Sequence, residues 1–216
     1  MDWKLITTVF LDMDGTLLDL SFDSYFWHEF VPQRFSEKNK LEFHVAKRML
    51  LKRFKSKAGS LEWYSVDYWS DELDLDIPAL KREVSKRIQI FPYVEKFLGS
   101  LKNRGIHIAL VTNAHRKSVD IKLDHLDLER YFDKIISSHD YGYAKEEQEF
   151  WHILMQSEPF DPATTLFVDD NLAVLASAEK YGIQHLLTIK QPDSSKPQQD
   201  TKHYPSIFNF DEIIPE

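Results

Sequence analysis

The chain has 216 residues and a net charge of −8, from 27 basic and 35 acidic side chains. This acidic balance disfavours a nucleic-acid backbone as the substrate, because phosphate contacts need clustered lysine and arginine. The sequence has no cysteine, which excludes disulfides, thiolate catalysis and zinc–thiolate sites and fits a reducing cytoplasm. It has no apolar run of about eighteen residues and no charged-then-apolar leader, so we expect no membrane span and no signal peptide.

The first predicted element is a buried strand that contains the apolar run Val9–Leu11 and ends in two carboxylates, Asp12 and Asp14. In an α/β sheet, ligands bind at the carboxyl ends of the strands. Two partly buried carboxylates at that position need a cation, a shared proton or both, because burying a bare charge is costly. We therefore predict a metal-dependent catalytic site at the end of this strand.

Residues 21–89 follow, and they are far too many for a simple loop. Helical spacing of apolar residues between Leu41 and Phe54, and a second segment from Leu61 to Leu73, predict a helical insertion. We expect residues 21–89 to form a helical cap domain over the site. Its aromatic side chains have two interpretations, a small core of the cap itself or a stacking surface for a nucleobase. The apolar positions that follow helical spacing in the first segment are Leu41, Phe43, Val45, Met49, Leu50 and Phe54.

From Phe91 onward, apolar strands alternate with helices, which predicts a parallel sheet. We expect helices over 92–103, 116–126, 146–157 and 171–181, and strands over 106–112, 134–138, 164–169 and 185–189. Residues 1–20 and 90–216 are predicted to form an α/β core domain, a Rossmann-like parallel sheet with the cap inserted after its first strand. The segment 191–203 is rich in Pro, Ser, Gln and Asp and is predicted to be a mobile loop, and the apolar residues after it to dock the terminus.

Three further candidate positions follow strands of this core. Thr112 and Asn113 end one strand, where a hydroxyl and backbone N–H groups can hold a phosphate, although either residue could simply cap the next helix. Lys145 follows another strand, although a lone lysine is usually a solvated surface group. Asp169 and Asp170 end a third. Because adjacent side chains on a strand point to opposite faces, we expect only one of these two to aim at the first carboxylate pair.

At these positions the sequence resembles the haloacid dehalogenase-like (HAD) hydrolase superfamily, over the full chain apart from the tail. The four superfamily motifs match Asp12-x-Asp14-Gly15-Thr16, Thr112, Lys145 and Asp169-Asp170. Further segments are similar to the bacterial GMP/IMP 5′-nucleotidases, namely 17–20, 26–27, 67–70, 112–115 and 142–143. Ala144 is a departure, since relatives often have proline before the lysine, and it could loosen the loop that aims Lys145.

The resemblance implies a phosphomonoesterase that hydrolyses purine 5′-nucleotides through an aspartyl-phosphate. It assigns Asp12 as the nucleophile and Asp14 as the acid that protonates the leaving oxygen and then takes a proton from water. Thr112, Asn113 and Lys145 would hold the phosphate oxygens. An aspartate at position 14 also favours phosphoryl chemistry over dehalogenation, because a halide leaving group needs no acid.

Mg²⁺ is the implied cofactor, because it prefers oxygen ligands and phosphate. The family pattern supplies the Asp12 carboxylate, the backbone carbonyl of Asp14 and one aspartate of the last pair as ligands. We expect Asp170 to be the direct ligand, with Asp169 one layer further out. The sequence alone does not decide between the two.

Two other functions remain open at this point. One is a phosphatase or mutase that acts on sugar phosphates or phosphoglycolate with the same core and different cap contacts. The other, less favoured, is a non-catalytic phosphate-binding regulatory module. The expected partner is a small-molecule phosphate monoester, a purine nucleoside 5′-monophosphate, with no nucleic acid and no membrane, and the sequence leaves the oligomeric state open.

Overall fold

The computed structural model describes residues 2–215, so Met1 and Glu216, the outermost residues of the predicted core, lie outside the described range. The described residues build one six-stranded sheet in the order β3-β2-β1-β4-β5-β6, with every neighbouring pair parallel. Strand β1, which carries the first carboxylate pair, lies between β2 and β4. The strands are β1 (Thr8–Leu11), β2 (His107–Thr112), β3 (Lys134–Ser137), β4 (Thr165–Val168), β5 (His185–Ile189) and β6 (Ser206–Ile207).

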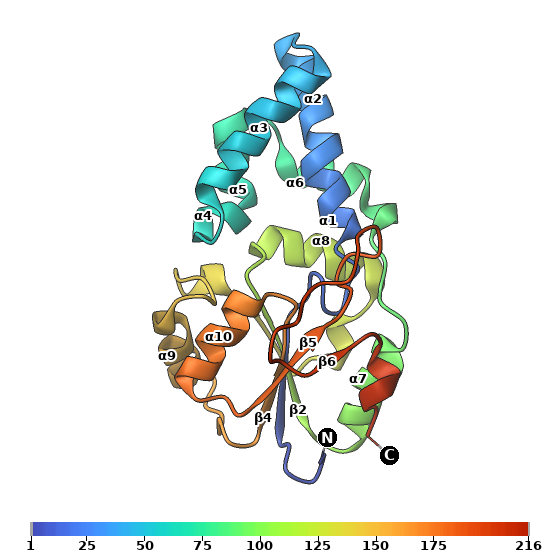
Figure 1. Cartoon of the computed structure of the whole chain (residues 1–216), viewed down its shortest axis with the longest axis vertical. Helices are drawn as coiled ribbons and strands as arrows, with labels where there is room; N and C mark the ends of the chain where they lie inside the picture. Colours follow the sequence, from blue (N-terminus) through green and yellow to red (C-terminus); the bar gives the residue numbers. More distant parts are fainter. Residues whose placement is uncertain (1, 216) are drawn as a thin grey trace.

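Helices cover both faces of this sheet (Figure 1). On β1, Val9 and Leu11 belong to the apolar cluster that includes residues of α7 and α8, whereas Phe10 between them packs with α9 and α10. This is the alternation expected of a strand buried on both sides, and it explains why the strands read as continuous apolar runs. The helices are α7 (Val94–Asn103), α8 (Arg116–Leu126), α9 (Gln148–Ser157) and α10 (Leu172–Tyr181), with short 3-10 turns at η3 (Glu129–Tyr131) and η4 (Ser138–Asp140).

Residues 21–89, called the cap below, are helical and lie at the far end of the molecule from the two termini (Figure 1). The cap has an apolar core of its own, in which Trp69 and Phe54 meet edge to face with their ring centroids 4.9 Å apart. Its elements are α1 (Ser21–Tyr25), the π-helical turn η1 (Phe26–Phe30), α2 (Val31–Asn39), α3 (Phe43–Lys57), α4 (Leu61–Tyr64), α5 (Val66–Leu73), α6 (Ile77–Glu83) and η2 (Ser85–Arg87).

The buried face of α3 differs from the sequence expectation. Ala46, Leu50 and Phe54 are buried, whereas Phe43 and Met49 are exposed, as is Leu41 just before the helix. The helix has apolar residues on two neighbouring ridges, and helical spacing cannot say which ridge the rest of the cap will cover. Of the apolar positions that follow helical spacing, Leu50 and Phe54 are buried, whereas Leu41, Phe43 and Met49 are exposed.

Two chain segments connect the cap to the sheet, and they pair with each other. Leu18 and Ile90 form an antiparallel bridge, with Asp19 N donating to Gln89 O and Phe91 N to Leu17 O, both at 2.9 Å. This short ladder sits directly after the turn that carries Asp12 and Asp14. The site residues of β1 therefore lie where the cap joins the core.

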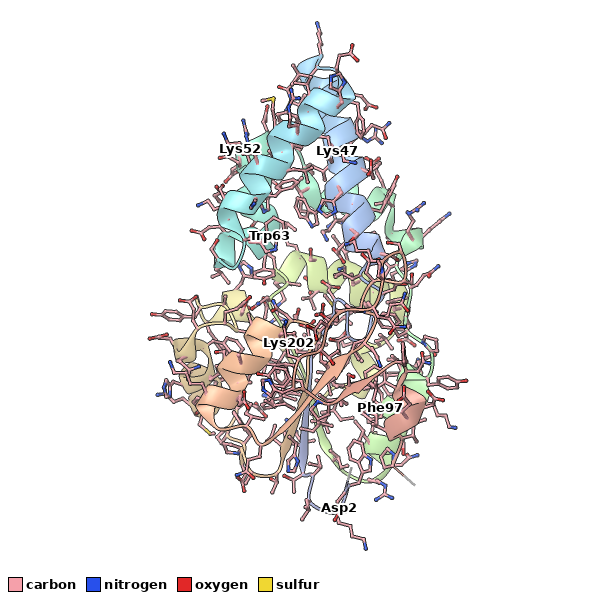
Figure 2. The ribbon with its side chains drawn as sticks, in the orientation of Figure 1. Asp2, Lys47, Lys52, Trp63, Phe97 and Lys202 are labelled. Atoms are coloured by element: carbon pink, nitrogen blue, oxygen red, sulfur yellow. The ribbon has the colours of Figure 1, made fainter. Side chains whose placement is uncertain are left out.

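The segment 191–203, predicted as a mobile loop, packs against α1 and the end of β4. Ser24 Oγ donates to the buried Asp193 at 2.6 Å, and Gln199 Nε2 donates to the backbone of Asp170 at 3.0 Å. The C-terminal segment then docks as expected, because Phe210 of η5 (Phe210–Ile213) packs on Phe97 of α7. Phe97 is labelled in Figure 2. Within residues 2–215, no helix combines the length and apolarity needed to cross a bilayer.

Candidate active site

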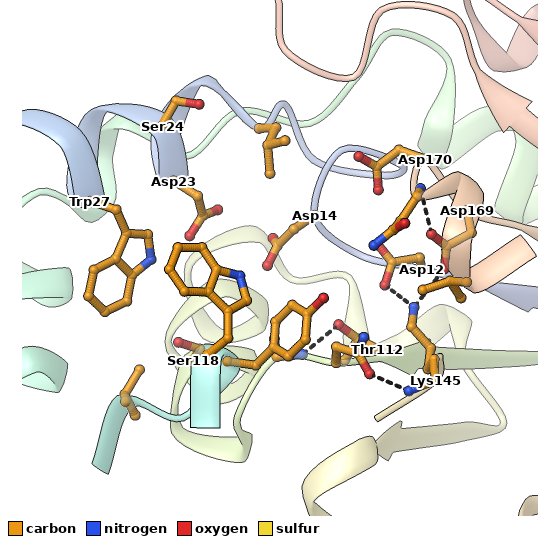
Figure 3. Close-up of a pocket in the computed structure, with 18 of the residues that line it drawn as sticks. Asp12, Asp14, Asp23, Ser24, Trp27, Thr112, Ser118, Lys145, Asp169 and Asp170 are labelled. Carbon is orange, nitrogen blue, oxygen red and sulfur yellow. Dashed lines mark hydrogen bonds and ion pairs between the residues drawn. The ribbon is translucent and has the colours of Figure 1, made fainter. Parts of the chain in front are cut away.

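Lys145 lies at the centre of the carboxylates at the carboxyl ends of β1 and β4. Its Nζ donates to Asp12 Oδ1 at 2.5 Å, to Asp169 Oδ2 at 2.7 Å and to the Val111 carbonyl at 2.9 Å (Figure 3). The side chain is 1% exposed. Burial alone would lower the pKa of this lysine, but Asp12 and Asp169 outweigh burial and raise it, so the ammonium stays charged. The structure thus brings together residues that lie 133 positions apart in the chain.

Asp170 joins the same cluster. Asp12, Asp169 and Asp170 each offer an oxygen, and these oxygens all lie within 4.8 Å of one another. The expectation that only one of the adjacent pair would aim at Asp12 was wrong. Strand β4 ends at Val168, so Asp169 and Asp170 lie in the turn beyond it, where the alternation of side chains no longer holds.

The two aspartates differ in their partners. Asp169 binds Lys145 through one oxygen and accepts the Asn171 backbone N–H at 2.8 Å with the other. For the Asp170 carboxyl, no hydrogen bond or ion pair is found within residues 2–215. Burial, followed by the charge of Asp169, raises the pKa of Asp170 well above its usual range. A half-buried carboxylate without a partner among the described residues, next to two buried ones, is the donor set that suits a hard divalent cation.

Gly15 allows Asp170 to approach the turn after β1. Its φ is +83°, a left-handed conformation that favours glycine, and a Cβ built there would lie 2.5 Å from Asp170 Oδ2. The carboxylate of Asp170 therefore rests against the backbone of the turn that carries Asp12 and Asp14.

Thr112 and Asn113 end β2 beside this cluster. Thr112 Oγ1 accepts the Ala114 backbone N–H at 3.1 Å. The Asn113 side chain accepts the backbone N–H of Lys145 at 2.9 Å and donates to Glu146 at 2.8 Å. Neither residue caps α8, because the side chain that accepts a hydrogen bond at that helix start is His115. Asn113 instead ties the end of β2 to the loop that carries Lys145.

Ala144 does not leave this loop unsupported. Its backbone N–H donates to Glu147 Oε1 at 3.0 Å, a bond that proline could not form because it lacks the donor. The residue is fully buried. The loop before Lys145 is therefore held by hydrogen bonds where relatives would use a proline ring.

Asp14 points into the cavity between Asp12 and the cap residue Asp23 (Figure 3). Its Oδ1 accepts from Lys122 Nζ at 2.5 Å. Burial, and then the neighbouring Asp23, raise the pKa of Asp14 to about 6, against the lowering effect of Lys122. Asp14 is thus the carboxyl of the first pair that lies on the cap side, away from Lys145.

A cavity of about 330 Å³ connects these carboxylates to the cap. Trp27 of η1 and Trp63 of α4 line it, together with the ring of Tyr64. Figure 2 shows Trp63 at the edge of the cap that faces the sheet, and Figure 3 shows Trp27 beside Asp23. The cap aromatics therefore divide into two groups. Trp69 is buried in the cap core, whereas Trp27 and Trp63 line the cavity, where a ligand can reach them.

Sequence reasoning missed several residues around the cavity. Lys122 is one, although it lies three residues after Val119 on the buried face of α8, where a lysine is unusual. Glu146 is another, and its position directly after Lys145 was the only local signal. No pattern in the sequence marked Asp23 or Lys81, and Tyr64 was marked only as one of the cap aromatics, because the partners of these side chains lie far away along the chain.

Residues 6–182 match the sequence profile of haloacid dehalogenase-like hydrolases. The chain is 37% identical over 213 residues to the GMP/IMP nucleotidase YrfG of Escherichia coli (strain K12), covering 99% of this chain and 96% of that protein. It is 27% identical over 188 residues to phosphoglycolate phosphatase 1 of Pseudomonas aeruginosa, covering 84% and 68% of the two chains.

Solved structures agree with this assignment at the level of the fold. The crystal structure of a HAD phosphatase from Thermococcus onnurineus superposes with a TM-score of 0.81 at 21% identity, and the match covers 96% of both chains. A putative β-phosphoglucomutase from Thermotoga maritima superposes with a TM-score of 0.67 at 17% identity, covering 97% of both. The Rossmann-like α/β fold with a helical insertion after the first strand, expected from the sequence, is confirmed.

Proposed function

Because this chain belongs to the haloacid dehalogenase-like hydrolases and is a phosphatase, we propose that it hydrolyses purine nucleoside 5′-monophosphates such as GMP and IMP. The observation that carries the proposal is the cavity itself. It has Asp12, Lys145 and Asp169 at one end and the indoles of Trp27 and Trp63 at the other. This arrangement suits a ligand with a phosphate at one end and a flat aromatic group at the other.

Asp12 is the proposed nucleophile. Lys145 holds its Oδ1, which leaves Oδ2 to attack phosphorus in line with the ester oxygen. A bond forms between Asp12 and phosphorus as the bond from phosphorus to the ribose oxygen breaks, and Asp14 gives its proton to that departing oxygen. In the second half-reaction Asp14 takes a proton from water, whose oxygen displaces the Asp12 carboxylate and releases phosphate.

Thr112, Asn113 and Lys145 are proposed to bind the transferring phosphoryl group. Thr112 offers a hydroxyl, the Asn113 backbone offers an N–H, and Lys145 brings a positive charge that stays fixed during the reaction. Because all three are buried, these donors act in a region of low dielectric, where charge stabilisation is strong.

We propose Mg²⁺ as the cofactor. Asp12 and Asp170 would hold it, with the Asp14 carbonyl as a third ligand, while Asp169 remains bound to Lys145 and Asn171. When bound, Mg²⁺ would neutralise the charge that builds up on the phosphate oxygens. The unpartnered carboxyl of Asp170 supports this assignment over a purely structural role for the cluster.

The purine base is proposed to stack on Trp63, with Trp27 on the same wall of the cavity. We propose a matching division of labour, in which residues 1–20 and 90–216 carry the chemistry and residues 21–89 recognise the base. Replacing Trp63 with leucine should raise KM for GMP about tenfold, because stacking on one aromatic ring contributes about 1–3 kcal/mol per base. KM for p-nitrophenyl phosphate should change much less, and an equal rise for both substrates would argue against stacking.

A substrate panel tests the proposal as a whole. The purified protein is incubated with GMP, IMP, AMP, phosphoglycolate and hexose phosphates at equal concentration, with Mg²⁺ and with EDTA, and phosphate release is measured. The purine nucleotides should have the highest kcat/KM, and Asp12→Asn should abolish turnover with the fold retained. Highest activity on phosphoglycolate or a hexose phosphate would instead favour the sugar-phosphate alternative, and nucleotide binding without turnover the regulatory one.

A further inference from the structure

Lys122 is a buried cation that the proposed chemistry leaves without a role. It lies on α8 of the core and is 1% exposed. Its Nζ donates to Asp14 Oδ1 at 2.5 Å and to Asp23 Oδ2 at 2.6 Å. Burying a lysine is expensive unless its charge is paired and its donors are satisfied, so these two contacts hold the side chain in one place.

The chain of charges continues into the cap. Asp23 of α1 also accepts from Lys81 Nζ of α6 at 2.9 Å, and Lys81 is itself buried. Burial alone would raise the pKa of Asp23, but Lys122 and then Lys81 outweigh it and lower the pKa to about 2. The alternating series Asp14, Lys122, Asp23, Lys81 therefore runs from the core turn through α8 to the first and last α-helices of the cap.

The contact with Lys122 also determines which oxygen of Asp14 can carry a proton. An ammonium group only donates hydrogen bonds, so Oδ1 acts as an acceptor and the contact favours a proton of Asp14 on Oδ2. Within residues 2–215, no hydrogen bond is found for Oδ2. Since Asp14 lines the cavity, Oδ2 is the oxygen free to meet a substrate.

We propose that Lys122 is a positioning residue, which orients the Asp14 carboxyl toward the ester oxygen and does so only while Asp23 and Lys81 of the cap lie against α8. This inference rests on the proposed phosphomonoesterase function. It adds that leaving-group protonation depends on the cap through a chain of buried ion pairs. Lys122 does not touch the reacting atoms.

The test is the dependence of the first chemical step on the leaving group. Lys122→Met keeps an unbranched side chain, one atom shorter, and removes its charge. A nucleoside leaves as an alkoxide and needs the acid, whereas p-nitrophenolate is stable without a proton. With enzyme in excess over substrate, the single-turnover rate constant of Lys122→Met on GMP should fall about 30-fold or more, and that on p-nitrophenyl phosphate by less than about threefold.

Two other variants sharpen the result. Lys117→Met changes an exposed lysine on the same helix, which pairs with Asp67 of the cap but not with Asp14, so both rate constants should stay within about threefold of the parent. Asp23→Asn leaves Lys122 in place and removes the negative charge of its second partner. It should cause the same selective loss on GMP, by about threefold to tenfold, and it serves as the test if Lys122→Met does not fold by circular dichroism.

The outcomes separate this inference from the proposed function. If the parent protein hydrolyses neither substrate, the proposed function fails and the positioning role falls with it. If the parent is active but the variants lose both substrates equally, or lose neither, the proposed function stands and the positioning role is overturned. A loss of activity confined to GMP, which has the poor leaving group, supports the positioning role of Lys122. A merely structural defect would not discriminate between leaving groups.

Discussion

The Tyr64 hydroxyl of the cap donates a hydrogen bond to Glu146 at 2.9 Å, and Glu146 directly follows Lys145 in the chain. The other oxygen of Glu146 accepts from Asn113 at 2.8 Å. One carboxylate therefore joins the cap to two core loops that border the phosphate site. Burial and the charge of Glu146 raise the pKa of Tyr64 far above its usual range, so the phenol remains a donor.

Tyr64→Phe removes this bond and should loosen the closed arrangement of cap and core. A hydrogen bond to a charged group contributes about 1.5–3 kcal/mol, and part of that should be lost from substrate binding, which raises KM for GMP about threefold to tenfold. We expect kcat to stay within about threefold, since Tyr64 has no role in the proposed proton transfers or in the attack on phosphorus. Steady-state kinetics give both constants.

The matched control for this variant is Tyr143→Phe, which alters an exposed tyrosine in the loop before Lys145. It should leave both constants unchanged. A fall in kcat of Tyr64→Phe at constant KM would contradict the view that the hydroxyl acts by holding the cap.

Gly15→Ala should inactivate the enzyme, because the added Cβ would collide with the Asp170 carboxylate. A displacement of about 1 Å at a catalytic group can lower kcat about 100-fold, and we expect at least that loss. Gly59→Ala is a close control, since Gly59 has a φ of +82° but nothing within 4 Å of its Cβ position. Both variants should lose about 1 kcal/mol of stability to the left-handed backbone, while only Gly15→Ala should lose activity.

Asp170→Asn should separate stability from metal binding. This half-buried carboxyl has a raised pKa, which means that its ionised form destabilises the metal-free fold. Removing the charge should therefore leave Tm in EDTA equal to that of the parent or higher. The rise in Tm that Mg²⁺ causes in the parent should be absent, because binding to the folded state stabilises it only where the site exists.

Thermal unfolding in EDTA and in Mg²⁺, at the same pH, measures both effects, and Asp71→Asn at an exposed position is the control. An undiminished Mg²⁺ effect in Asp170→Asn would remove this residue from the proposed ligand set.

His139 should make the fold sensitive to mild acid. Burial, and then the nearby His115, lower the pKa of His139 to about 4 from 6.5, and its Nε2 is buried without a hydrogen bond partner. The unfolded chain therefore takes up a proton near pH 6.5 that the folded chain takes up only near pH 4. Between these values the contribution of His139 to stability falls as the pH falls, against the opposite contribution of the carboxyls with raised pKa, such as Asp14. Because the ring is partly open to solvent, we expect a contribution of about 1–2 kcal/mol over this range.

His139→Phe keeps the edge-on contact with the His115 ring and removes the titration. Urea unfolding at pH 7 and at pH 5 should show a smaller loss of stability for this variant than for the parent. His44→Phe, at an exposed position, should retain the pH dependence of the parent. If the free energy of unfolding changes equally with pH in the parent and in His139→Phe, other groups cause the acid sensitivity.

The local sequence pattern was sufficient to predict most helices and strands of the core. The helix predicted over 116–126 and the strand over 185–189 match α8 and β5 residue for residue. The strand β5 is bounded by a strong signal, since it is an apolar run that follows the helix-ending Gly182. The short strand β6 was missed because two residues give no periodicity.

The cap was harder to predict for a physical reason. In α3, helical spacing marked Met49, Phe43 and Leu50 alike, yet the structure buries only Leu50 of these three and also buries Ala46, which the spacing had not marked. The cap is small, so several faces of a helix remain exposed and apolar residues occur on more than one of them. The burial of each ridge then depends on the packing of the other cap helices.

The sequence by itself determined the strand positions, the superfamily and the four motifs at the strand ends, because strands buried on both faces must be apolar where they pack and polar only where they end. Only the tertiary structure decided that both Asp169 and Asp170 face Asp12, and that Lys122 reaches Asp14 across 108 positions of the chain. Such contacts follow from where the turns and helices come to rest. A local pattern of residues carries no information about which distant side chains will meet in space.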